Sequence, residues 1–381
     1  MSKKFTSLFA VLLLLAAGVA PVGAVSGDAA VASTGATATQ TDCSFPVTET
    51  DATETEVTVE QKPERVVTLA PSAAQTMWEI GGESQVVGVS QYANYLEGAD
   101  SRTNISGAGQ SYVNVEKVVS TEADLVLAPN VIPNETVQKL RDAGLTVFKL
   151  GYASSVEDIY AKTNLIGTLT GNCEGATETV SWMQDRIGTV RDAVEGEDAP
   201  GVLISQGGGW TAGSGTFVGN VVELAGGTNV AAEANVSGYG KISEEVIVQQ
   251  NPEWIIQLGA FGAYPQTEAY NGTNAVKNGQ VLTVSNENIS QPAPRVVHAV
   301  VKMAQAFHPD AYAEANTTTT TVETTEAPDT TTDAATTAED AMQEATTETT
   351  TADSSTGSIP GFGVSAALAA LAGAAMLAGR R

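Results

Sequence analysis

Few side chains in this sequence could carry out chemistry on a substrate. The chain has two histidines, His298 and His308, and two cysteines. A zinc or manganese site needs three or four convergent ligands, which two histidines in one helical segment do not supply. No G-x-S-x-G nucleophile elbow, histidine-based triad or P-loop is present either. The sequence therefore predicts no enzyme activity, no metal site and no resident cofactor.

Aromatic side chains just after predicted strands favour recognition instead. Trp210 follows the run Gly207-Gly208-Gly209, which leaves room for a large group close to the backbone. Aromatic faces stack on flat ring systems, although loop aromatics can also pack on their own domain. Arg295 could neutralise an anionic ligand or form a structural ion pair. The candidate binding residues are Trp210, Tyr92, Tyr95, Asn130, Phe261, Tyr264 and Arg295.

These candidates need a scaffold that gathers strand ends, and the hydrophobic pattern predicts one. Short β-branched runs alternate with helical stretches on both sides of residues 155–194, where two helices follow each other without a strand. Strands are expected at 66–70, 86–90, 124–128, 146–150, 202–205, 254–258 and 281–285. Helices are expected at 72–80 (with Ser72 and Gln75 spaced as a capping box), 114–123, 134–143, 155–170, 174–194, 217–225, 243–250 and 294–307. The fold class is therefore α/β, with two lobes flanking a helical connector and a ligand cleft between them.

The N-terminus has the features of an export signal. Lys3 and Lys4 precede an apolar stretch at 8–20, and small residues follow up to Ala24. The expected boundaries along the chain are a signal peptide at 1–24, a flexible arm at 25–55, an N-terminal lobe at 56–171, a linker helix at 172–197, a C-terminal lobe at 198–315, a stalk at 316–358 and a sorting signal at 359–381.

The C-terminus has the features of a surface anchor. A Thr-rich acidic tract at 316–356 is too polar to bury a core and is expected to form a disordered stalk. Pro360-Gly361-Phe362, a weak apolar helix and a final Arg380-Arg381 then resemble the PGF-CTERM sorting signals of haloarchaeal surface proteins. The resemblance implies the extracellular face of the membrane and processing by an archaeosortase. A retained transmembrane anchor is the alternative.

The charge balance limits the partners. The formal net charge is −26, and an acidic, lysine-poor surface suits high salt, where screening removes most of the self-repulsion. No basic stripe is available to neutralise phosphates, so nucleic acid is not an expected partner. We expect a monomer.

The two cysteines and several asparagines fit an exported protein. Cys43 and Cys173 are expected to form a disulfide between the N-terminal arm and the middle of the chain, with two free thiols as the alternative. N-x-S/T sequons, which are candidate glycosylation sites, begin at Asn104, Asn134, Asn235, Asn271, Asn288 and Asn316.

Several short motifs, in order and at matching spacing over about residues 56–312, resemble the solute-binding proteins for vitamin B12 and iron-siderophores. They are Pro63 to Ser72, Val86-Val87-Gly88-Val89, Asn114 to Val118, Ala123 to Ala128, Gly213 to Phe217, Glu223 to Val230 and Pro294 to Pro309. The resemblance implies two Rossmann-like lobes joined by one long rigid helix, here Glu174–Val194. It also implies delivery of a small-molecule ligand to an ABC permease with its ATPase.

In such proteins a glutamate on each lobe docks onto the permease, and the matching positions are Glu116 and Glu245. In so acidic a chain, either could also be only a solvated charge. The aromatic strand ends and the lack of a clustered basic pocket favour cobalamin or a related corrinoid over a ferric siderophore or haem. A surface-layer or adhesive protein is the alternative from another class, and it predicts repeated all-β domains.

Overall fold

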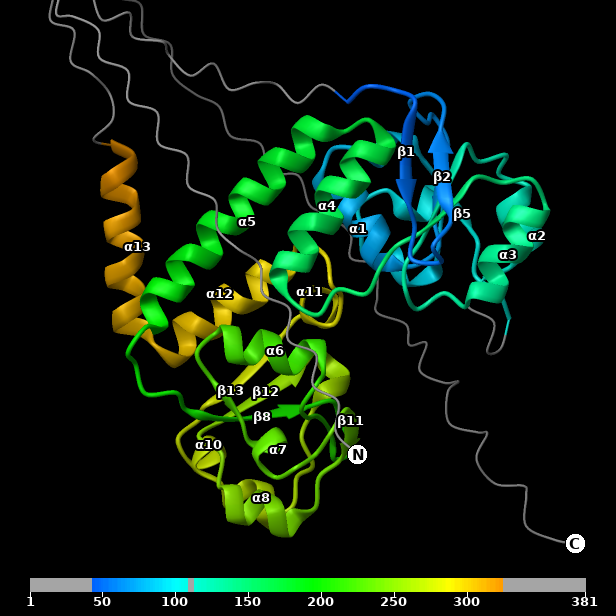
Figure 1. The fold of residues 1–381 in the computed structure, drawn as a ribbon. Helices are drawn as coiled ribbons and strands as arrows, with labels where there is room; N and C mark the ends of the chain where they lie inside the picture. Colours follow the sequence, from blue (N-terminus) through cyan, green and yellow to red (C-terminus); the bar gives the residue numbers. More distant parts are fainter. Residues whose placement is uncertain (1–42, 109–112, 325–381) are drawn as a thin grey trace, which may run out of the picture. The chain divides into compact units, whose positions relative to one another are not determined.

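The computed structural model describes residues 43–108 and 113–324 (Figure 1). The predicted signal peptide at 1–24, most of the arm (25–42), the stalk from 325 onward and the sorting signal at 359–381 lie outside the described residues. Within the described ranges, no helix has both the length and the apolar character that a membrane span needs.

The N-terminal lobe is built on a parallel sheet in the order β5-β4-β3-β6-β7. Its strands are β3 (Val66–Thr68), β4 (Val86–Val89), β5 (Thr103–Asn104), β6 (Leu125–Ala128) and β7 (Val147–Lys149). Successive residues of β6 enter two different hydrophobic cores, since Leu125 and Leu127 face one and Val126 and Ala128 the other. A strand buried on both faces must be apolar throughout, which is why these runs could be recognised. The helices of this lobe are α1 (Pro71–Glu79), α2 (Val115–Val119) and α3 (Asn134–Asp142).

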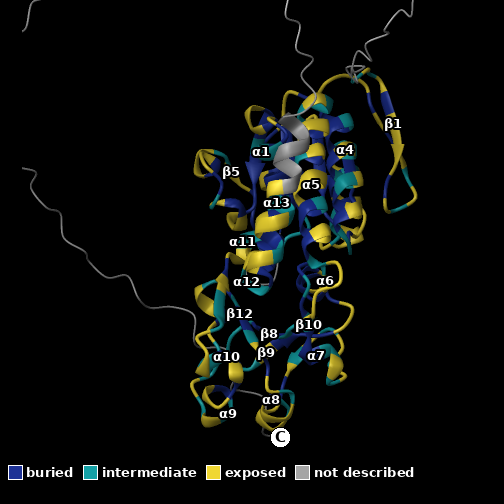
Figure 2. Ribbon diagram, turned by 90° about the vertical axis from the view of Figure 1, so that its left-hand side faces the viewer, coloured by how far each residue is buried: buried dark blue, intermediate teal, exposed yellow. Residues whose placement is uncertain are grey.

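The C-terminal lobe repeats this design with a parallel sheet in the order β10-β8-β12-β13. Ile255 and Ile256, adjacent on β12, again enter different cores, and β8 beside them is almost entirely buried (Figure 2). A separate antiparallel ribbon pairs β9 with β11. The elements are β8 (Gly201–Ser205), β9 (Trp210–Ala212), α6 (Phe217–Leu224), β10 (Thr228–Asn229), α7 (Val230–Glu233), β11 (Tyr239–Lys241), α8 (Glu244–Gln250), β12 (Trp254–Leu258), α9 (Glu268–Asn271), α10 (Asn274–Lys277), β13 (Val281–Val284), α11 (Asn286–Ile289) and α12 (Val296–Phe307).

Two consecutive helices, α4 (Val156–Thr170) and α5 (Cys173–Val194), connect the lobes. Ser155 and Asp158 form a capping box at the start of α4, and Gly171 ends it in the left-handed conformation. Ala176, early in α5, belongs to a core of the N-terminal lobe, whereas Ile187 and Val190 belong to a core of the C-terminal lobe. One helix is therefore part of both lobes. The predicted α/β class with parallel sheets is confirmed.

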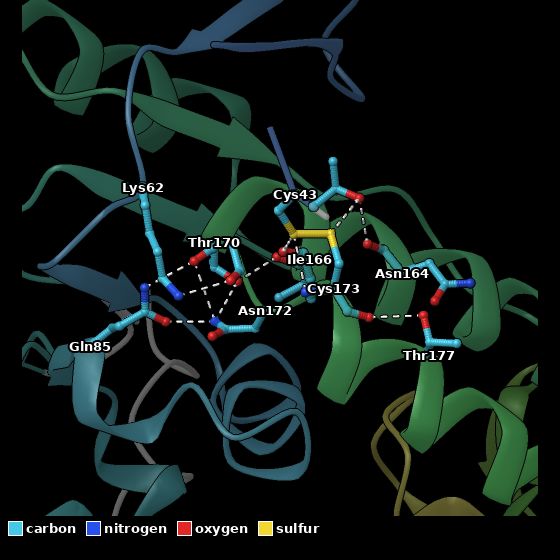
Figure 3. Close-up of a disulfide and its surroundings, with 12 residues drawn as sticks. Cys43, Lys62, Gln85, Asn164, Ile166, Thr170, Asn172, Cys173 and Thr177 are labelled. Atoms are coloured by element: carbon cyan, nitrogen blue, oxygen red, sulfur yellow. Dashed lines mark hydrogen bonds between the residues drawn. A yellow bond between two sulfur atoms is a disulfide. The ribbon is translucent and has the colours of Figure 1, made fainter. Parts of the chain in front are cut away.

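The turn between α4 and α5 is fixed by a disulfide between Cys43 and Cys173, whose Cα atoms are 5.7 Å apart (Figure 3). Beside it, Lys62 Nζ donates to Gly171 O at 2.9 Å. Asn172 Nδ2 donates to Gln85 Oε1 at 2.6 Å. The N-terminal segment is therefore held at the start of the linker helix by one covalent bond and several polar contacts.

Two predictions at the edges of the folded part were wrong. Residues 47–59, which fall largely in the predicted flexible arm, form a hairpin of β1 (Val47–Thr50) and β2 (Glu56–Val59). Its turn residue Asp51 accepts hydrogen bonds from Lys149 N and from the Arg141 guanidinium, which fasten the hairpin to the N-terminal lobe. At the other end, α13 (Pro309–Thr324) replaces the first part of the predicted stalk and lies along α5 (Figure 1). Tyr312 is buried in the core there, which stabilises the Thr-rich helix.

A polar network adds a second connection between the lobes. The sequence predicted Ser72 and Gln75 as a capping box, but Ala70 is the N-cap of α1 and makes no side-chain cap bond. Gln75 is buried instead, and its Oε1 accepts from the backbone N–H of Arg295 at 3.0 Å. Arg295 Nε also donates to Glu79 Oε1 at 2.6 Å. The role of Gln75 is therefore to connect the two lobes and not to cap α1.

Lys162 on α4 also contacts the other lobe and should make the stability depend on pH. Its Nζ donates to Pro292 O, and burial lowers the pKa of Lys162 from 10.5 to about 8, against the opposing effect of Asp158. Between these values the unfolded chain binds a proton that the folded chain has released, so stability rises with pH. From pH 7.5 to 9.5 the free energy of unfolding should rise by about 2 kcal/mol relative to Lys162→Met.

The measurement is urea unfolding of both proteins across that range, with Lys277→Met at an exposed lysine as the control. A constant difference between wild type and Lys162→Met at every pH would contradict the prediction.

Candidate ligand-binding site

Four exposed hydrophobic side chains share one position relative to their strands. Tyr92, Val131, Tyr152 and Phe261 each lie three residues beyond the end of β4, β6, β7 or β12. Between 58% and 94% of each side chain is accessible to solvent. The first three belong to the N-terminal lobe and Phe261 to the C-terminal lobe. Parallel α/β sheets bind ligands at the carboxyl ends of their strands, so this position is the one expected for ligand contacts.

Trp210 ends a glycine turn that approaches the loop carrying Phe261. Its backbone N–H donates to Gly207 O at 3.0 Å, and its own carbonyl accepts from Gln206 N at 2.9 Å. Gly207 has φ 88°, and a Cβ there would lie 2.2 Å from Phe261 O. Only glycine allows the two loops this approach. The tryptophan side chain remains 47% exposed.

The β9–β11 ribbon adds further groups next to Trp210. Trp210 pairs with Lys241, and Tyr239, two residues before Lys241, lies on the same face. Tyr239 is exposed. The part of its side chain that the protein covers is desolvated, which raises the pKa of the phenol, and nearby Tyr152 of the other lobe raises it further. Asn220 Nδ2 also donates to Ser154 O at 3.0 Å, so the two lobes meet beside these tyrosines.

Lys149 holds the loop that carries Asn130 and Val131. It is buried, and its Nζ donates to the carbonyl oxygens of Pro129, Asn130 and Ile132. Burial lowers the pKa of Lys149, with Asp51 opposing this. Its ammonium group is therefore committed to the protein and is not offered to a ligand.

The other predicted site residues have protein partners. The Tyr95 hydroxyl accepts from Gln75 Nε2 at 2.9 Å and donates to Gln291 Oε1 at 3.4 Å, and burial raises the pKa of this phenol. Arg295 forms an ion pair with Glu79, one of the two roles left open for it. Tyr264 stacks on Tyr270 with ring centroids 6.0 Å apart. Asn130 is half-buried.

Val131, Tyr152 and Tyr239 were not among the residues proposed from the sequence. For Val131 and Tyr152 a signal existed, because the offset of three residues that selects Tyr92 and Phe261 also selects them. Tyr239 could not be found this way, since it depends on the pairing of β11 with β9. In the described part of the chain, no group of three or more histidine, cysteine, aspartate or glutamate side chains is placed to hold a metal ion.

Two parallel α/β lobes that share one long helix and expose aromatic side chains at their strand ends define a two-lobed solute-binding protein. The chain belongs to the periplasmic binding protein family, whose model matches residues 66–287. Residues 359–381 match the PGF-CTERM motif. The protein is therefore an extracytoplasmic solute-binding protein of the cell surface, anchored through its C-terminus.

Similar proteins agree with this assignment. The chain is 49% identical over 349 residues, 89% of each chain, to a cobalamin-binding protein of Halobacterium salinarum. It is 27% identical over 281 residues to the ABC transporter substrate-binding lipoprotein YvrC of Bacillus subtilis, covering 71% of this chain and 88% of that one. The periplasmic heme-binding protein RhuT from Roseiflexus has the same fold, with a TM-score of 0.59 and 22% identity over 65% of this chain and 99% of that chain.

The surface-layer alternative predicted repeated all-β domains. The two parallel sheets and their crossover helices do not fit it.

Proposed function

We propose that this protein captures cobalamin or a related corrinoid outside the cell and delivers it to an ABC permease. The observation that carries the proposal is the set of exposed apolar side chains at strand ends in both lobes. Flat aromatic faces from two sides suit a rigid macrocycle, which could stack on them with little loss of side-chain freedom. The 49% identity to a cobalamin-binding protein supports the same ligand.

The charges near these side chains also favour a corrinoid. Arg295 is paired with Glu79, and Lys149 is enclosed by carbonyl oxygens. Lys241, opposite Trp210, is the exposed cation on the ribbon. Cobalamin is fringed with amides and has one phosphodiester, which a single lysine can pair with. A highly anionic siderophore would need a cluster of free cations.

The proposal is tested by titrating the mature chain with cyanocobalamin in molar KCl. We expect one ligand per chain with a Kd below about 1 µM. A neutral ferric hydroxamate and haemin are titrated in parallel, because a ferric siderophore or haem is the alternative ligand. Binding of either one without binding of cyanocobalamin would show that the corrinoid assignment is wrong.

The remaining roles follow from delivery to a membrane transporter. We propose that exposed Glu116 on α2 and Glu245 on α8 dock onto the permease, that an archaeosortase processes the C-terminus, and that the protein acts as a monomer without catalysis or a resident cofactor. Charge-assisted pairs with basic permease residues would fix the orientation of the two lobes.

A further inference from the structure

The described residues expose eight large hydrophobic side chains. Six of them, discussed above, are at strand ends or on the β9–β11 ribbon. The other two are Val119 on α2 and Val248 on α8, which are 37% and 61% exposed. A single exposed valine needs no explanation. These two valines, however, occupy equivalent positions in the two lobes.

The two valines occupy the same position on equivalent helices. Each helix directly precedes a strand, β6 or β12, that pairs in parallel with the first strand of its lobe's main sheet, β3 or β8. Each begins at a residue whose side chain caps the helix, Asn114 or Ser243.

Counting from the cap also gives the same order of residues. An exposed glutamate comes second, a buried aliphatic residue fourth and an exposed valine fifth. The glutamates are Glu116 and Glu245, the buried residues Val118 and Ile247, and the valines Val119 and Val248.

Glutamate and valine share one helix face, because residues three apart on a helix are neighbours. On the C-terminal lobe this face also borders a hollow of about 670 Å³ between α8 and α9. Val248, Ala269 and Thr273 contribute to its lining, together with Glu245. A protruding side chain with an apolar stem and a cationic head would contact both kinds of group.

We propose that Val119 and Val248 are the apolar halves of two matched docking patches, Glu116/Val119 and Glu245/Val248. The occupant of each is one of two equivalent permease loops that present a basic side chain beside an apolar one. This inference rests on the proposed delivery to a permease. In molar salt the Debye length shrinks to about 3 Å. Exposed ion pairs then contribute little, while apolar contacts do not weaken. The valines therefore carry more of the docking affinity than the glutamates.

The test uses the full chain and the permease–ATPase complex of the same organism in lipid nanodiscs. Val119→Ser with Val248→Ser should raise the Kd for the permease about tenfold or more in molar KCl. Glu116→Gln with Glu245→Gln should have a smaller effect there, and a larger one as KCl is lowered. Val131→Ser is the matched control, since this exposed valine lies at a strand end and belongs to neither patch.

The valine variants should bind cyanocobalamin as the wild type does, whereas Val131→Ser should bind it more weakly and dock normally. Docking by the double valine variant with wild-type affinity would overturn the proposal, whatever the glutamate variants do. Failure of the wild type to bind cyanocobalamin would count against the proposed ligand only, because docking is measured without ligand.

Discussion

Replacing Cys43 and Cys173 with serine should lower the free energy of unfolding by about 4–5 kcal/mol. The disulfide joins residues 130 positions apart, and closing so long a loop removes much conformational freedom from the unfolded chain. Urea unfolding in constant high salt measures the change. Ligand affinity should be unchanged in the variant, since the bond lies at the turn between α4 and α5 and involves none of the candidate binding residues.

Treating the wild type with a reductant should give the same shift as the double substitution. Equal midpoints for oxidised and reduced protein would show that the hydrogen bonds around Gln85 and Asn172 hold the turn without the covalent bond.

Removing the aromatic faces of the C-terminal lobe should have the largest effect on ligand binding. Trp210→Ala should weaken cyanocobalamin binding about tenfold, and Trp210→Ala combined with Phe261→Ala about 100-fold, as each stacked ring contributes roughly 1–1.5 kcal/mol. Calorimetric titration measures both. Because the two side chains are exposed, the unfolding midpoint should hardly move.

Two replacements of Trp210 distinguish stacking from simple apolar contact. Trp210→Phe keeps a flat face and should retain most of the affinity for cyanocobalamin. Trp210→Leu keeps an apolar side chain without a flat face and should lose most of this affinity. Equal affinity for wild type and both variants would remove Trp210 from the site.

The sequence identified the elements whose residues are uniformly apolar. Strand β6 is buried on both faces and is a continuous run of aliphatic residues, and Ile255-Ile256 form the buried centre of β12. The β1–β2 hairpin was missed because only Val47, Val57 and Val59 of its strand residues are buried, in a segment otherwise rich in threonine and glutamate. Helix α13 was missed for a similar reason, since its threonine-rich second half gives no sign of the contact with α5.

The sequence predicted the position of the candidate residues as far as it depends on strand ends. Trp210, Tyr92 and Phe261 follow their strands and are exposed in the structure. Tyr95 follows an expected strand and Arg295 lies at the start of an expected helix. Each of them, however, forms a hydrogen bond with a residue of the other lobe. Their partners Gln291 and Glu79 are distant in sequence, and no local pattern reveals such pairs.

The path of α13 also decides how mechanical load enters the molecule. The C-terminal anchor pulls on the chain beyond residue 324, and α13 runs along α5 with Tyr312 seated in the core beside it. Tension from the cell surface therefore reaches the fold through helix packing against the linker. Tyr312 shares that core with residues of β8 and β12, so a pull on the anchor would be distributed over many packed side chains and not applied to a single strand.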